Sequence, residues 1–166
     1  LGPLSNPAGV SHQAVGVADS RMAPIMAEAL ARLGRRHAVV FRGDDGLDEL
    51  TTTGPSQLWE IRDGVVTSTR FDPAELGLAT AEPDQLRGGD VATNVTVADA
   101  VLRGSAGPAA DIVALNAAAG LYAADAVTDL AAGLALAREV LAGGAALELR
   151  HRWAAHTQTL RGAGRG

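Results

Sequence analysis

The sequence contains no cysteine, and only 3% of its 166 residues are aromatic. The absence of cysteine excludes disulfides, thiolate metal ligands and cysteine nucleophiles. With so few aromatic rings, the core has to be built from alanine, valine and leucine, which favours close-packed helices on a small sheet. No apolar stretch is long enough to cross a membrane without meeting a charge or a glycine, so no transmembrane helix is predicted.

An excess of positive charge is also missing. The formal net charge is −5 and the isoelectric point is about 5.3, which gives a field that repels phosphate polymers. Two short basic clusters, residues 35–37 and 150–152, lie next to predicted helix ends, where the helix dipole alone favours cations. Residues 1–4 have neither the basic nor the apolar segment of a signal peptide. We therefore expect neither a nucleic-acid partner nor a membrane partner.

The remaining composition is globular, and the length suits one domain. Residues 13–17 and 38–41 predict two strands, and the segment between them predicts a helix closed by Gly34. The expected apolar face of this helix consists of Met22, Ile25, Met26, Leu30 and Leu33. Such a βαβ unit has a right-handed crossover and two parallel strands.

A hairpin is predicted next, with strands at residues 57–62 and 65–71 joined by an Asp-Gly turn at 63–64. The rest of the sequence is helical, with helices predicted to begin near residues 90, 108, 128 and 145. The alanine-rich stretches among these helices are suited to close packing against each other or a sheet. These elements predict an α/β fold over residues 1–160, followed by a flexible tail at 161–166.

An acidic loop, Gly43–Glu49, directly follows the second predicted parallel strand and carries four carboxylates in six residues. Ligands of open α/β sheets bind beyond the carboxyl ends of the strands, so a site is expected here. Oxygen ligands suit Mg²⁺, which takes one or two protein carboxylates and leaves its other positions to water and substrate phosphates. The alternative is an acidic surface loop that caps the element after it. The residues alone leave both interpretations open.

A second glycine-rich segment, Leu86–Asp90, precedes a predicted helix. It has the form of an anion cradle, but Asp90 would place a carboxylate at the same helix N-terminus, so a tight turn with an N-cap is favoured. The four histidines are scattered along the chain, and no Ser/His/Asp arrangement can be defended from their spacing.

Five segments, taken in order, resemble the anthranilate phosphoribosyltransferase family of tryptophan biosynthesis, which has the nucleoside phosphorylase/phosphoribosyltransferase fold. They are residues 1–8 (LGPLSNPA), 13–17 (QAVGV), 43–49 (GDDGLDE), 86–90 (LRGGD) and 116–119 (NAAA). Both the order and the spacing agree with the family over residues 1 to about 149.

The resemblance implies a cytoplasmic, Mg²⁺-dependent glycosyltransferase that moves a phosphoribosyl group from phosphoribosyl pyrophosphate (PRPP) to the amine of anthranilate. In that family the adjacent Asp-Glu of the acidic loop holds the metal, which by direct match implies Asp48 and Glu49 as Mg²⁺ ligands. Asp44 and Asp45 then look like loop structure or outer charge. The implied sheet is mostly parallel, with helices packed around it.

Some of the family's features are not found in these residues. Its PRPP loop (GTGGD), its KHGN segment, its anthranilate-binding arginine and its dimer-forming N-terminal helical domain all precede the segment that matches residues 1–8. We therefore expect an incomplete α/β domain that begins at Leu1 within a larger unit. We also expect no substrate-binding residues in this chain, no assignable catalytic residue, and no activity of the chain alone.

Two alternatives stay open at this point. A nucleoside phosphorylase-like enzyme would share the fold and use phosphate, although the Asp48-Glu49 pair disfavours it. A non-catalytic binding or regulatory relative is the other, and retention of the same pair argues against it.

Overall fold

Strand β2, His37–Gly43, is buried along almost its whole length and organises the fold. The structure, a computed structural model, describes residues 2–163 and the side chains of residues 2–161. Leu1, where the first resembling segment begins, lies outside the described residues. The strands are β1 (His12–Gly16), β2, β3 (Ser56–Arg62) and β4 (Val65–Phe71), and the α-helices are α1 (Met22–Arg32), α2 (Val91–Leu102), α3 (Pro108–Ala123), α4 (Leu130–Ala142) and α5 (Ala145–Ala163).

The four strands form one sheet in the order β1-β2-β3-β4. β1 and β2 are parallel and joined through α1, whereas β2/β3 and β3/β4 are antiparallel. The α/β class is thus confirmed, but the sheet is mixed where the resemblance implied a mostly parallel one. The link between β2 and β3 carries no crossover helix, and the Asp63-Gly64 turn reverses the chain, so both later pairings are antiparallel.

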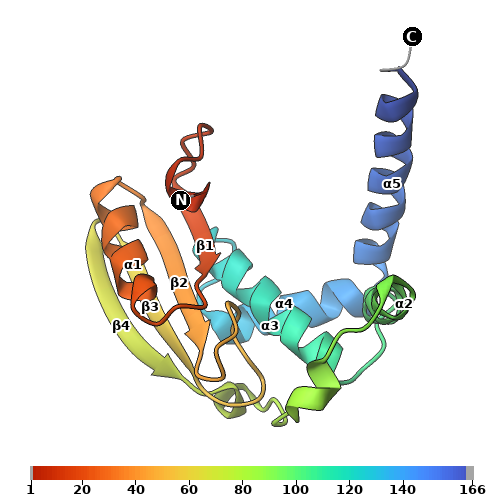
Figure 1. Cartoon of the computed structure of the whole chain (residues 1–166), viewed down its shortest axis with the longest axis horizontal. Helices are drawn as coiled ribbons and strands as arrows, with labels where there is room; N and C mark the ends of the chain where they lie inside the picture. Colours follow the sequence, from red (N-terminus) through yellow and green to blue (C-terminus); the bar gives the residue numbers. More distant parts are fainter. Residues whose placement is uncertain (1, 164–166) are drawn as a thin grey trace.

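Helices cover both faces of the sheet (Figure 1). Alternate residues of β2 point to opposite faces: Ala38 and Val40 pack with α1, while Val39 and Phe41 belong to the core shared with α3 and α4. That second core is rich in alanine, in line with the expected small side chains. Its alanines are Ala114, Ala118, Ala119, Ala123 and Ala137.

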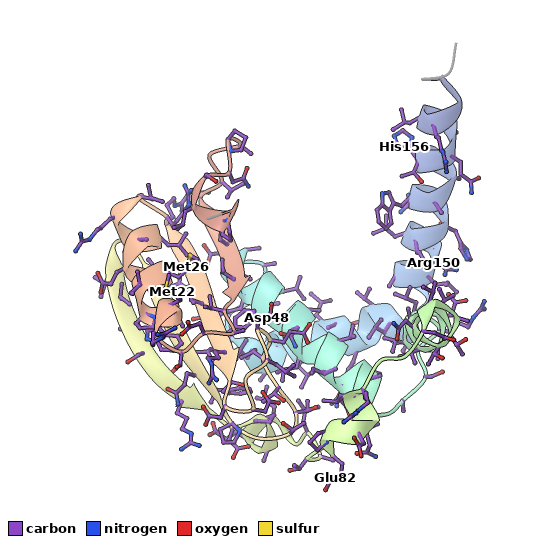
Figure 2. The ribbon with its side chains drawn as sticks, viewed as in Figure 1. Met22, Met26, Asp48, Glu82, Arg150 and His156 are labelled. Atoms are coloured by element: carbon purple, nitrogen blue, oxygen red, sulfur yellow. The ribbon has the colours of Figure 1, made fainter. Side chains whose placement is uncertain are left out.

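The face that α1 buries differs from the predicted one. Ala23, Ala27 and Leu30 are fully buried, whereas Met22, Ile25 and Leu33 are about half exposed. Figure 2 labels Met22 and Met26, of which only Met26 packs against the core. Alanine lets the helix axis approach the sheet closely, so Ala23 and Ala27 share the inner face with Leu30, while Met22 and Ile25 lie outside it.

Close packing also joins α3 to α4. A Cβ built on Gly133 of α4 would lie 2.9 Å from Cα of Ala118 on α3, so the two backbones touch. This contact confirms the expectation that the small-residue stretches pack helix on helix.

The apolar residues of α2 are largely solvent-exposed. Only Val101 of this helix is buried, while Val91, Val95 and Val97 are exposed. Helix α5 projects away from the other elements (Figure 1), and the side chains of its residues 151–161 are exposed. It continues to Ala163, three residues beyond the predicted end, so the predicted tail begins inside the helix; residues 164–166 lie outside the described part.

No single helix within residues 2–163 is long and apolar enough to span a membrane. Helices α4 and α5 meet the length and composition test only as a pair, which is bent by 66°.

Candidate functional site

The acidic loop leaves the carboxyl end of β2 and folds into a tight turn. The amide of Gly43 donates to the carbonyl of Leu47 (3.0 Å), and that of Gly46 donates to the carbonyl of Gly43 (3.0 Å). Gly46 has a φ of +99°, a conformation that favours glycine. The turn directs the next residues, Asp48 and Glu49, across the end of β1; Figure 2 labels Asp48 there.

The backbone of Asp48 lies directly against Gly16, the last residue of β1. A Cβ built on Gly16 would come within 1.6 Å of the Asp48 carbonyl oxygen and 2.6 Å of its carbonyl carbon. Only glycine leaves room for this approach. The glycine of the QAVGV strand therefore sets the position of the acidic loop at the carboxyl ends of both parallel strands, where the sequence placed the site.

Two of the four loop carboxylates are engaged within the protein. Asp44 accepts from Arg70 on β4 (2.9 Å). Asp45 accepts from the hydroxyls of Thr51 and Thr53 (2.6 Å each) and from the Leu47 amide (3.1 Å). Partial burial by itself would raise the pKa of Asp45, but these three hydrogen bonds outweigh it and lower the pKa. The two acids thus stabilise the loop.

The other two, Asp48 and Glu49, are exposed and unengaged. Within residues 2–161, neither carboxylate has a hydrogen bond or an ion pair with another side chain or with the backbone. The four acids of the loop are therefore divided by structure into a pair that shapes the loop and a pair whose carboxylates are left without a partner among residues 2–161. This is the same division that the resemblance implied.

The residue after this pair is fixed from a distant helix. The side-chain oxygen of Asn116, on α3, accepts from the Leu50 amide (2.9 Å), and its nitrogen donates to the Leu50 carbonyl (2.8 Å). The Leu50 side chain is fully buried in the core between the sheet and α3. Glu49 is thus followed by a rigidly held residue.

The glycine-rich segment forms a tight turn with an N-cap, the favoured interpretation. It follows a 3₁₀ helix, Pro83–Leu86, and the Asp90 carboxylate accepts from the amide of Thr93 (2.8 Å) at the start of α2. Hydrogen bonding to the backbone and hydroxyl of Thr93 lowers the pKa of Asp90. A cavity of about 350 Å³ separates this turn from the acidic loop. Its lining residues are Asp45, Leu47, Thr53, Pro83, Leu86 and Arg87.

The donor set suits Mg²⁺ better than a metal that needs a full protein cage. In the described part of the chain, no group of three or more His, Cys, Asp or Glu side chains is arranged to hold a metal ion. The side chains of Asp48 and Glu49 are exposed, so they could offer two hard oxygen ligands and leave room for water and substrate phosphates.

Sequence reasoning missed a polar cluster at the opposite end of β2. His37, only 1% exposed, contacts Asp125 through Nδ1 (2.8 Å), and His12 contacts the other oxygen of Asp125 through Nε2 (3.0 Å). Glu60 completes the cluster, 3.3 Å from His37 and bonded to the hydroxyl of Tyr122 (2.7 Å). The parallel register that pairs His12 with His37 was the available signal.

The charges in this cluster are mutually stabilising. The hydrogen bond from His12, followed by those from His37 and Arg62, lowers the pKa of Asp125. Burial alone would raise the pKa of Glu60, but hydrogen bonds from Tyr122 and Arg62 outweigh it and lower the pKa. Asp125 lies just beyond the C-terminal end of α3 with a φ of 56°, and its carboxylate contacts both histidines.

Comparison with known proteins decides the family. Residues 1–147 match the family described as "Glycosyl transferase family, a/b domain". The chain belongs to this family. Within it, the anthranilate phosphoribosyltransferase of Arthrobacter sp. (strain FB24) is 54% identical in an alignment of 164 residues that covers 95% of this chain and 46% of that protein.

Solved structures of this glycosyl transferase family agree with the fold. The anthranilate phosphoribosyltransferase of Thermus thermophilus superposes with a TM-score of 0.83 at 42% identity, over 93% of this chain and 45% of that one. The Saccharomyces cerevisiae enzyme in complex with PRPP and Mg superposes with a TM-score of 0.77 at 25% identity, over 89% and 43%. The chain thus spans somewhat less than half the length of the relatives it matches.

Proposed function

We propose that this chain is the metal-binding portion of an Mg²⁺-dependent anthranilate phosphoribosyltransferase of tryptophan biosynthesis. The observation that carries the proposal is the free carboxylate pair of Asp48 and Glu49, held at the carboxyl ends of two parallel strands. The names of the similar proteins, and the relative solved with PRPP and Mg, support the same assignment.

In the proposed reaction, the amine of anthranilate attacks the anomeric carbon of PRPP and pyrophosphate leaves. Bound Mg²⁺ would neutralise the charge that develops on the leaving pyrophosphate. Asp48 and Glu49 would hold that ion, while Asp44 and Asp45 keep the loop in shape through Arg70 and the two threonines. Two carboxylates make only part of an Mg²⁺ shell, so we expect weak affinity for the ion without pyrophosphate.

We further propose that the 166 residues alone do not turn over substrate, because they cover less than half of the relatives' length. An assay of the purified chain with Mg²⁺, anthranilate and PRPP tests this. The expected result is no pyrophosphate release above background, and robust turnover would contradict it.

A chimera tests the activity itself. The matched segment of the Arthrobacter enzyme is replaced by this chain, and consumption of anthranilate and release of pyrophosphate are followed. We expect an active chimera, and a loss of about a hundredfold or more when Asp48→Asn and Glu49→Gln are introduced together. A folded chimera that is inactive, or one that consumes phosphate and nucleoside instead, would contradict the proposal and favour a phosphorylase.

A further inference from the structure

Asn116 stands out because its side chain makes three hydrogen bonds, all of them to backbone groups. Its oxygen accepts from the Leu50 amide, and its nitrogen donates to the Leu50 carbonyl and to the carbonyl of Ile112 (2.9 Å), one turn earlier in α3. Both backbone polar groups of one residue are thereby held by a single side chain, 66 positions away in sequence.

The segment that carries Asp48 and Glu49 is short and is held at both ends by hydrogen bonds. On its upstream side, Leu47 is bonded through its carbonyl to Gly43 and through its amide to Asp45. On its downstream side, Leu50 is bonded to Asn116. Only Asp48 and Glu49 lie between, and the Asp48 carbonyl rests on Gly16. The freedom left to the two carboxylates is therefore that of their side chains.

We propose that Asn116 is a positioning residue for the cation site, because it fixes the peptide from which Asp48 and Glu49 present their carboxylates. This inference rests on the proposed role of that pair in binding the ion. Groups that orient metal ligands without touching the metal typically govern affinity by about ten- to a hundredfold. Preorganisation is the physical reason: a loop that is already ordered loses less conformational entropy on binding.

The chain offers a matched control. Asn94 makes the same pair of contacts with another turn, accepting from the Gly89 amide (2.9 Å) and donating to the Gly89 carbonyl (3.0 Å). Asn94→Leu and Asn116→Leu thus each remove the pair of hydrogen bonds to one backbone residue, and only the second touches the acidic loop; Asn116→Leu also removes the bond to the Ile112 carbonyl within α3. Asn116→Asp keeps the acceptor for the Leu50 amide and loses the donor, which provides a milder variant if Asn116→Leu does not fold.

The test uses ¹⁵N-labelled chain and two readouts. Without metal, amide hydrogen exchange at Leu50 should accelerate at least about tenfold in Asn116→Leu and stay unchanged in Asn94→Leu. With pyrophosphate present, titrated Mn²⁺ serves as the probe, and its dissociation constant comes from paramagnetic broadening of the loop amides. It should rise on the order of tenfold in Asn116→Leu, less in Asn116→Asp, and not at all in Asn94→Leu.

The outcomes separate the inference from the function on which it rests. If the wild-type chain binds Mn²⁺ at the loop and Asn116→Leu binds it equally well, the inference is overturned and the proposed function stands. If the wild-type chain shows no broadening at the loop, the proposed metal-binding function itself fails, and Asn116 is reduced to a structural contact. Unchanged exchange at Leu50 in a folded Asn116→Leu would overturn the positioning role whatever the metal does.

Discussion

The carbonyl of Asp48 occupies the space where a side chain at Gly16 would stand. A Cβ at Gly16 would lie 1.6 Å from that oxygen, far inside van der Waals contact. Gly16 and Asp48 are 32 positions apart in the sequence, yet each determines where the other can lie. The position of the Asp48 and Glu49 carboxylates therefore depends on the absence of a methyl group at residue 16.

Gly16→Ala should displace the acidic loop. Because the obstacle is backbone and cannot rotate away, we expect a loss of about 1–3 kcal/mol in the free energy of unfolding, measured by urea denaturation. Gly54→Ala is the control, since a Cβ there meets no atom within 4 Å and should change stability little. Equal stability of the two variants would show that the loop does not rest on Gly16.

The position of the acidic loop at the sheet edge was predictable from the sequence, and the different contacts of its four acids were not. Four acids within six residues follow a parallel strand, and ligands of α/β folds generally bind at the carboxyl ends of such strands, so the sequence indicates a site at this edge of the sheet. Which two are free depends on Arg70, Thr51 and Thr53, and nothing in the loop's own sequence shows that these side chains engage Asp44 and Asp45. The resemblance to the family implied the same two residues, Asp48 and Glu49, as the metal ligands, and that role stays a prediction.

A paired substitution tests the packing between α3 and α4. Gly133→Ala should destabilise the protein by about 1–3 kcal/mol, because the new methyl group would meet the backbone of Ala118 at 2.9 Å. Gly120→Ala, inside α3 with no neighbour within 4 Å, should stabilise it by up to about 1 kcal/mol through helix propensity. Thermal unfolding followed by circular dichroism measures both effects. Shifts of the melting temperature in the same direction for the two variants would contradict the close packing of α3 against α4.

The helix faces were harder to predict than the helices. A pattern of large apolar residues predicted the inner face of α1, yet the structure buries Ala23 and Ala27 and leaves Ile25 outside. Hydrophobic periodicity ranks residues by size and polarity, whereas close approach to a sheet selects the small ones. The His12–Asp125–His37 cluster was not predicted, for a different reason. Its members lie at the ends of three elements, and the two histidines become neighbours only through the register of β1 and β2.

That cluster makes the stability depend on pH in the acid range. The pKa of Asp125 in the folded protein lies below its ordinary value of 3.8. Its contribution is therefore fully present above the unfolded-state value and is lost as the pH falls through the folded-state value.

We expect Asp125→Asn to lower the melting temperature at pH 7, and the gap from wild type to shrink as the pH falls below about 4. Asparagine also tolerates the positive φ of this position, so backbone strain is matched. Asp84→Asn, which removes only the exposed ion pair with Arg87, is the control and should shift the melting temperature little at any pH. A gap for Asp125→Asn that stays constant from pH 7 to pH 3 would contradict this account.

The central claim is that Asp48 and Glu49, of the four loop acids, bind the divalent cation. The most direct measurement is Mn²⁺ broadening of the amide spectrum of the chain in the presence of pyrophosphate, compared among wild type, Asp44→Asn and the double variant Asp48→Asn, Glu49→Gln. We expect broadening centred on residues 47–50 in wild type and in Asp44→Asn, and none there in the double variant. Broadening that persists at the loop in the double variant, or that is centred elsewhere in wild type, would contradict it.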